Sequence, residues 1–161
     1  MSAVRLQIDL RGQRLHWNGP EGACRSFVIS SGAAGAGERD GSGCTPRGRH
    51  VVRARIGAGA DPMAVFVGRR PTGECWTPEL AAAHPARDWI LGRILWLSGR
   101  EPGRNRFGAV DTMRRYIYIH GTPPDQPLGV PASHGCIRMA CEDVVALFEI
   151  TPVGCTVEIH E

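Results

Sequence analysis

The chain has six cysteines but lacks a CxxC pair. The cysteines stand at positions 24, 44, 75, 136, 141 and 155. Without closely paired cysteines, a zinc ribbon and a thioredoxin-type redox motif are disfavoured, and in a reducing compartment all six would be free thiols. We expect Cys24, Cys44, Cys75 and Cys155 to be small buried or half-buried side chains. Cys136 differs from them because a histidine and a glycine directly precede it.

The chain also lacks a long hydrophobic run. No window approaches the roughly 18 apolar residues of a membrane span. The N-terminal stretch MSAVRLQIDLRGQRLHW has no apolar core of the roughly 7–15 residues typical of secretory signals, and Arg5, Asp9 and Arg11 interrupt it. We therefore expect no membrane partner. We expect a cytoplasmic location if Met1 is the natural start, and a periplasmic one if the N-terminus has been trimmed.

The net charge is +3, but the basic residues do not cluster: no run of five or more basic residues occurs. A nucleic-acid-binding protein usually carries a clustered basic face, so we expect no nucleic-acid partner. The 161 residues, with 42% hydrophobic and 22% charged, have the composition of an ordinary globular protein. This length suits one domain, 1–161, that buries a core without disulfides or metals.

Turn residues, 21 Gly and 12 Pro, divide the chain into short segments. Their hydrophobic patterns predict strands at residues 4–10, 14–17, 26–30, 51–57, 63–68, 115–121 and 154–161. Residues 89–97 fit a helix or a strand, and the pattern favours a strand. Residues 140–150 predict a short helix, and residues 32–50 predict a flexible loop, part of which (32–44) is either a disordered insertion or an active-site rim. Many short strands with one clear helix predict a mainly β sandwich or barrel.

The stretch YIYIHGTPPDQPLGVPASHGCIRM, residues 116–139, gathers His120, His134 and Cys136 around a proline-rich loop. Three interpretations compete: a metal site that includes Cys141, a cysteine nucleophile with its base, and a tight turn without chemistry. His134 and Cys136 are closer in sequence than structural zinc pairs usually are. A turn alone does not account for three reactive side chains in one segment.

The nucleophile interpretation fits these residues best. A base beside a thiol lowers its pKa, so we expect Cys136 to react at a lower pH than an ordinary thiol does. His120 ends a predicted strand in which Tyr116, Tyr118 and His120 share one face. The loop can return Cys136 to it, and the carbonyl of Gly121 is a candidate for orienting the imidazole. Backbone N–H groups beside Cys136 would then face a developing oxyanion.

The same residues resemble a known family. IHGT at 119–122 with SHGCIRM at 133–139 is similar to the active-site signature of L,D-transpeptidase (YkuD-type) catalytic domains, and TPRG at 45–48 is similar to their TPxG turn. The resemblance covers roughly residue 24 to the end. It implies a mainly β, L,D-transpeptidase-like β-sandwich with one or two short helices, and neither a cofactor nor a metal.

The resemblance also implies roles for individual residues. Cys136 would be the nucleophile, His120 the general base and Gly121 the source of the orienting carbonyl. The remaining active-site positions fall around the oxyanion and the substrate: Ser133, His134 and Gly135 at the oxyanion, and Tyr118 and Arg138 at the substrate. For Arg138 a bracing role competes with a grip on a substrate carboxylate. For His134, loop bracing competes with catalysis, for Tyr118 core packing competes with pocket lining, and Ser133 suits a local cap.

Substrate and reaction follow from the resemblance as well. The implied partner is a peptidoglycan stem tetrapeptide, cut after its third residue, meso-diaminopimelate. Water as acyl acceptor makes a carboxypeptidase, and an amine makes a transpeptidase. RILWLSGREPGRNRFG followed by DTMRRYIYIHGT resembles short members that release D-Ala as murein tetrapeptide L,D-carboxypeptidases during peptidoglycan recycling.

We therefore expect the carboxypeptidase activity. The alternatives are a transpeptidase that forms 3-3 crosslinks or exchanges D-amino acids, a non-catalytic wall-peptide-binding domain, and a redox pair of Cys136 with Cys141. The glycan state of the substrate and the oligomeric state are not predicted.

Overall fold

The computed structural model describes residues 4–161, so the first three residues of the predicted domain lie outside it. In the described part the fold is mainly β with two short α-helices, as predicted. The strands are β1 (Arg5–Asp9), β2 (Arg14–Asn18), β3 (Cys24–Val28), β4 (Gly48–Ile56), β5 (Ala64–Val67), β6 (Arg70–Cys75), β7 (Ile90–Gly99), β8 (Tyr118–Thr122), β9 (Ile137–Ala140) and β10 (Thr156–His160). The helices are α1 (Pro78–Ala83), α2 (Cys141–Glu149) and the 3-10 turns η1 (Pro20–Gly22) and η2 (Gly108–Val110).

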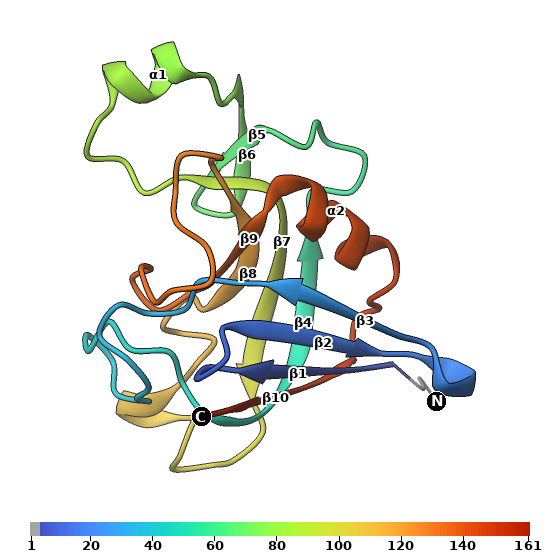
Figure 1. The fold of residues 1–161 in the computed structure, drawn as a ribbon. Coiled ribbons are helices and arrows are strands. Elements are labelled where there is room, and N and C mark those ends of the chain that lie inside the picture. The colour runs from blue at the N-terminus through green and yellow to red at the C-terminus, as the bar shows by residue number, and fades with distance from the viewer. Residues whose placement is uncertain (1–3) are drawn as a thin grey trace.

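The ten strands form one continuous, curled sheet (Figure 1). Its main path runs β3-β2-β1-β10-β4-β7-β5-β6, and β8 and β9 branch from β7. The strands β4 and β7 pair over much of their length, and β7 also pairs with β5 and β8. The short strands β1, β2 and β3 lie beside β10, away from the end that carries α1 (Figure 1). The sheet therefore bends so that two of its faces enclose a core.

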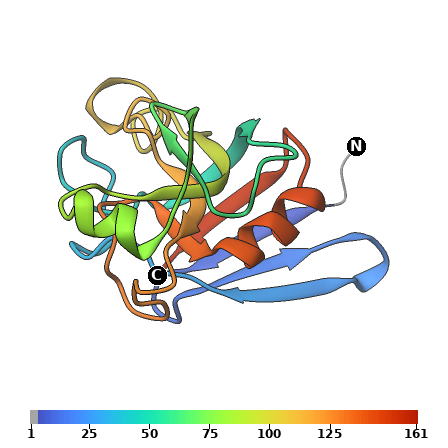
Figure 2. The same ribbon diagram turned by 90° about the horizontal axis from the view of Figure 1, so that it is seen from above.

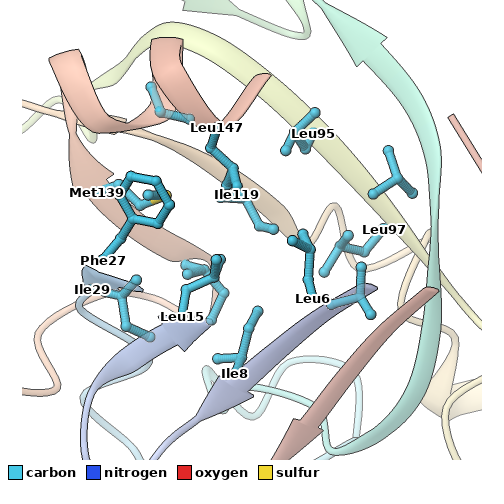
Figure 3. Close-up of a cluster of buried hydrophobic side chains, with 14 of the residues drawn as sticks. Leu6, Ile8, Leu15, Phe27, Ile29, Leu95, Leu97, Ile119, Met139 and Leu147 are labelled. Atoms are coloured by element: carbon cyan, nitrogen blue, oxygen red, sulfur yellow. The ribbon is translucent and has the colours of Figure 1, made fainter. Parts of the chain in front are cut away.

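Apolar side chains, which alternate with polar ones along the strands, fill this core (Figure 3). In β1, Leu6 and Ile8 point inward while their neighbours face solvent, as the period of two requires. From the other side, α2 packs against β7, β8 and β9 and buries Leu147. Figure 2 shows α2 lying across the strands rather than apart from them. The packed helix and sheet fix the position of β8 and β9, which carry the two His-Gly motifs.

Several elements differ from the sequence-based expectation. The segments β6, β9 and α1 were not predicted as elements. The helix α1 had a usable signal, because Thr77 caps it by accepting a hydrogen bond from Leu80 N–H (3.0 Å) and proline follows. The predicted strand at 115–121 begins only at Tyr118, because Tyr116 adopts a left-handed conformation with φ of 57°. The expected shared strand face therefore excludes Tyr116.

Two cysteine predictions were wrong. Cys24 and Cys75 are exposed, because they stand at the ends of β3 and β6 near solvent, whereas Cys44 is half-buried and Cys155 is buried. None of the helices among residues 4–161 is long and apolar enough to cross a membrane.

Candidate active site

The parallel pairing of β8 with β9 brings the two His-Gly motifs together. The register sets Ile119 opposite Ile137 and His120 opposite Arg138. Cys136 directly precedes β9, so it lies at the level of Tyr118, two residues before His120 on β8. Residues two apart on a strand share a face, so the chain presents the thiol and the imidazole on one side of this ribbon.

The thiol of Cys136 is held by backbone groups. Its Sγ accepts a hydrogen bond from Tyr118 N–H (3.3 Å) and donates one to the Tyr116 carbonyl (3.2 Å). Burial raises the pKa of the Cys136 thiol to about 12, although the Tyr118 N–H opposes the rise. The expectation of a low-pKa thiol is therefore wrong for the free protein: Cys136 rests as a neutral thiol.

The imidazole of His120 is fixed by its neighbour in the sequence. The side chain is only 1% exposed, and its Nδ1 lies 2.7 Å from the Gly121 carbonyl. A carbonyl only accepts, so Nδ1 carries the proton and Nε2 keeps its lone pair. Burial lowers the pKa of His120, and the Gly121 carbonyl opposes this. The structure thus places the Gly121 carbonyl where the sequence analysis expected it, beside a neutral imidazole.

The loop before Cys136 is closed by Ser133. The Ser133 hydroxyl accepts from Gly135 N–H (3.1 Å) and donates to the Cys136 carbonyl (2.6 Å). This is the local cap expected of Ser133. The Gly135 N–H is already engaged, so the expectation that it faces an oxyanion is wrong. Gly135 has φ of 126°, and a Cβ there would lie 3.1 Å from the Cys44 carbonyl, so the turn requires glycine.

Residues 32–45 form a rim against this loop. The Ala33 N–H donates to the Ser133 carbonyl (2.9 Å), and Thr45 Oγ1 donates to the Gly135 carbonyl (2.9 Å). Arg115 donates to the Cys44 carbonyl (2.6 Å) and to the Gly37 carbonyl (3.2 Å), and so joins two parts of the rim. The segment is therefore an active-site rim and not a disordered insertion.

Asp88 joins two of the predicted residues. Its carboxylate accepts from Arg138 Nη2 (3.0 Å) and lies 3.4 Å from His134 Nδ1. Arg138 is 6% exposed and also donates to the Ala132 carbonyl (3.2 Å). Its donors are thus largely used within the protein, which favours bracing over a grip on substrate. Asp88 lies far from both motifs in the sequence, and no local pattern marks it.

These residues border a polar pocket of about 220 Å³. The pocket is lined by Pro85, Ala86, Arg87, Asp88, Trp89, Thr122, Pro123, Gln126, His134 and Arg138. The side chain of His134 is 77% exposed at its edge, and its contact with Asp88 matches the bracing interpretation. From β8 the pocket is lined by Thr122, and from the segment around Cys136 it is lined by His134 and Arg138.

Tyr118 is only 4% exposed. Its hydroxyl accepts from Arg69 Nη1 (3.0 Å), and its ring meets Trp96 edge-on at 5.7 Å. This burial favours core packing over direct lining of the pocket. Arg69, from the β5–β6 turn, has no sequence signal that connects it to the motifs.

The other cysteine chemistry is disfavoured by geometry. Cys136 and Cys141 stand at opposite ends of β9, and an extended strand separates them by roughly 15 Å, too far for a disulfide. The buried Cys141 Sγ donates to the Thr122 carbonyl (3.4 Å) instead. No group of three His, Cys, Asp or Glu side chains converges as metal ligands within residues 4–161.

Curated proteins of two bacteria are similar to parts of the chain. It is 46% identical over 94 residues to the probable L,D-transpeptidase YbiS of Escherichia coli, covering 57% of this chain and 30% of that protein. It is 45% identical over 55 residues to the putative L,D-transpeptidase YqjB of Bacillus subtilis, covering 34% of this chain and 31% of that protein. Each match spans less than a third of the relative's length.

Solved structures of L,D-transpeptidases share the fold. One from Xylanimonas cellulosilytica aligns with a TM-score of 0.55 at 22% identity, covering 99% of this chain and 61% of that one. L,D-transpeptidase 3 from Mycobacterium tuberculosis aligns with a TM-score of 0.58 at 16% identity, covering 99% and 62%. The family model of the L,D-transpeptidase catalytic domain (YkuD) matches residues 3–159. Since this match spans nearly the whole chain, the protein belongs to the L,D-transpeptidase catalytic domain family.

Proposed function

We propose that the protein is a cysteine-dependent L,D-carboxypeptidase. It would remove the terminal D-Ala from tetrapeptide stems that contain meso-diaminopimelate, in peptidoglycan recycling in the cytoplasm. The observation that carries the proposal is the β8–β9 pairing, which sets a thiol and a correctly oriented neutral imidazole on one face. A thiol at the start of one strand and an oriented base on the adjacent strand suit acyl transfer, whereas a binding module has no use for either.

The first half of the reaction releases D-Ala. The thiol proton turns from the Tyr116 carbonyl to His120 Nε2 as Cys136 Sγ attacks the diaminopimelate carbonyl carbon. Because both groups start neutral, charge develops only as the S–C bond forms. The negative oxygen faces the loop at Cys136, where the Cys136 N–H is the remaining candidate donor. The protonated His120 then gives its proton to the D-Ala nitrogen, the C–N bond breaks, and a thioester remains.

The second half hydrolyses the thioester. His120 Nε2 takes a proton from water as the water oxygen attacks the thioester carbonyl. The C–S bond then breaks, the proton returns to Cys136, and the tripeptide leaves with a new carboxylate. The Gly121 carbonyl accepts from Nδ1–H throughout and stabilises the transient imidazolium.

A transpeptidase is the second candidate, because YbiS and YqjB are both named as L,D-transpeptidases. The thioester would then be attacked by an amine of a second stem or by a free D-amino acid. The residues that form the acyl-enzyme are the same in either case. The two activities differ only in the acceptor, so product analysis separates them.

The test is incubation of the purified protein with a diaminopimelate-containing tetrapeptide and identification of products by mass spectrometry. We expect tripeptide plus free D-Ala, no turnover in Cys136→Ala, and a loss of several orders of magnitude in kcat for His120→Ala. Crosslinked dimers or D-amino-acid exchange as the main products would reassign the protein as a transpeptidase. Tetrapeptide binding without any product in the wild type would favour the non-catalytic binding domain.

A further inference from the structure

An arginine stacked between aromatic rings lies next to the thiol. The guanidinium of Arg69 lies over the rings of Trp96 (5.0 Å to the centroid) and Tyr116 (4.8 Å), and it donates to the Tyr118 hydroxyl (3.0 Å). The rings of Trp96 and Tyr116 are 6.1 Å apart. We call Arg69, Trp96, Tyr116 and Tyr118 the arginine–aromatic cluster. Stacking and hydrogen bonding together hold a cation in one orientation.

The backbone at two members of this cluster is unusual. Gly68 and Arg69 form the two-residue turn between β5 and β6, with φ of 56° and 64°. Such a turn favours glycine or asparagine at positive φ, yet an arginine stands there. Tyr116 also has positive φ and is 53% exposed. Strained residues that gather beside a reactive group are typical of ligand-binding positions.

Arg69 has no acidic partner within residues 4–161. The ion pairs of the described chain use other arginines: Arg47, Arg87, Arg104 and Arg138. Arg115 spends its donors on the Gly37 and Cys44 carbonyls. Among the described residues the guanidinium of Arg69 donates one hydrogen bond, to the Tyr118 hydroxyl, so most of its five N–H donors have no acceptor from the protein. The planar guanidinium group can bind a carboxylate through two parallel hydrogen bonds.

The cluster and the Asp88 pocket lie at different ends of β8. Tyr116 and Tyr118, which belong to the cluster, both hydrogen-bond to Cys136 Sγ through their backbones, whereas Thr122 is the β8 residue that lines the Asp88 pocket, together with His134 and Arg138. A peptide whose scissile carbonyl meets Sγ therefore extends toward the pocket in one direction and toward Arg69 in the other. Both arginines that line the pocket pair with acids, Arg138 with Asp88 and Arg87 with Glu74, whereas Arg69 has no acidic partner among the described residues.

We propose that Arg69 binds the free α-carboxylate of the single D-amino acid that leaves from the tetrapeptide. This inference rests on the proposed function and adds the basis of its selectivity. Only a terminal residue offers a carboxylate one residue beyond the scissile bond, so the clamp restricts cleavage to the chain end. A free D-amino acid that returns as acceptor would occupy the same clamp.

The experiment pairs a change in the enzyme with a change in the substrate. Wild type and Arg69→Gln are each given a tetrapeptide with a free terminal carboxylate and the same peptide ending in D-alaninamide. We expect the wild type to prefer the carboxylate in kcat/KM by about 10- to 100-fold, as for a charge-assisted hydrogen-bonded pair. In Arg69→Gln this preference should disappear, with turnover of the amide almost unchanged. Arg69→Lys keeps the charge without the fork and should recover only part of the preference.

Arg70→Gln is the matched control, because Arg70 follows directly in β6 and is exposed. It should keep the wild-type preference. The inference is wrong if the wild type cleaves both peptides equally well, or if Arg69→Gln loses the same factor on both. The first outcome is independent of whether the variants fold. Failure of the proposed function gives a different result: a non-catalytic domain is acylated by neither peptide, and a transpeptidase converts the acyl-enzyme into crosslinked or exchanged products instead of tripeptide.

Discussion

At the scale of single residues, the active site combines a neutral thiol with a neutral imidazole. Burial raises the pKa of Cys136 and lowers that of His120, so both shifts oppose a resting thiolate–imidazolium pair. The gain from this arrangement is a base that stays unprotonated in mildly acidic solution. The cost is a thiol that becomes nucleophilic only when substrate brings the carbonyl carbon and His120 to it.

This predicts slow alkylation of Cys136 in the free protein. With a pKa of about 12, only about one Cys136 thiol in 10⁵ is ionised at pH 7, and the fraction grows as pH rises. We expect the alkylation rate of Cys136, followed peptide by peptide with iodoacetamide and mass spectrometry, to climb steadily above pH 9. Exposed Cys24 provides the internal reference and should react sooner.

The variant His120→Ala distinguishes the neutral pair from an ion pair. In the neutral pair, removing the imidazole leaves the pH profile of Cys136 alkylation nearly unchanged while turnover collapses. A profile with a midpoint below pH 8 in the wild type, shifted upward in His120→Ala, would show an ion pair and contradict the neutral assignment.

The residues of the candidate site differ in how well the sequence marks them. Cys136, His120 and Gly121 could be selected from the sequence, because each stands in a short motif whose residue types and spacing indicate a thiol beside an oriented imidazole. Asp88 and Arg69 were not predictable, because they reach the site through the loop before β7 and the β5–β6 turn. Their contacts depend on how the sheet curls, which no local pattern contains.

At the scale of elements, the rim formed by residues 32–45 supports the nucleophile. Thr45 is 1% exposed, accepts from Gly32 N–H (2.8 Å) and donates to the Gly135 carbonyl (2.9 Å). One hydroxyl therefore joins the rim to the residue before Cys136. The TPRG similarity marked this position in the sequence, but its link to Gly135 became visible only in the structure.

Thr45→Val tests this link. The substitution keeps the shape but leaves the Gly32 N–H and the Gly135 carbonyl buried without partners, which costs about 1–3 kcal/mol in free energy of unfolding. Because Gly135 then shifts with Cys136, we expect kcat/KM for the tetrapeptide to fall roughly 10- to 100-fold. Urea denaturation and the turnover assay measure the two effects. Thr45→Ser keeps the hydroxyl and should stay near wild type, whereas equal losses in both variants would exclude the hydrogen bond as the cause.

The elements themselves were predicted best where one face is buried. The alternation of Leu6 and Ile8 in β1 and the apolar stripe of α2 gave strands and helix in the right places. The strand β9 was missed, because all four of its residues are largely buried and therefore show no alternation. Its parallel partner β8 is also buried along its whole length, so the two His-Gly motifs lie at buried strands of the sheet.

At the scale of the whole molecule, a buried histidine connects the sheet to the segment that leads to the candidate active site. His50, from β4, is fully buried, and its Nδ1 donates to the Gly48 carbonyl (3.0 Å). Its Nε2 accepts from the Thr112 hydroxyl (2.9 Å), which belongs to the connection that leads from β7 to β8. These hydrogen bonds join β4 to the segment that precedes β8 and the candidate active site. Stability of the fold therefore depends on keeping His50 neutral.

Burial lowers the pKa of His50 to about 4, although the Gly48 carbonyl opposes the shift. Above pH 6.5 both the folded and the unfolded chain carry neutral His50, and the group adds no pH dependence. As pH falls from 6.5 to 4, the unfolded chain gains a proton that the folded chain does not, so the free energy of unfolding decreases. The full loss below pH 4 is about 3 kcal/mol, and it would bring acid unfolding into the pH range of ordinary assays.

His50→Gln removes this titration. The variant should be less stable than wild type at pH 7, because the Thr112 hydroxyl and Gly48 carbonyl lose their partner. The difference should shrink by about 3 kcal/mol between pH 7 and pH 4, because only the wild type then carries the cost of a buried histidine. Urea denaturation at a series of pH values measures it, with exposed His84→Gln as the control that leaves the pH dependence unchanged. A constant difference between wild type and His50→Gln across this range would mean that His50 has the same pKa in the folded and the unfolded chain, which would contradict the lowered pKa of the buried ring.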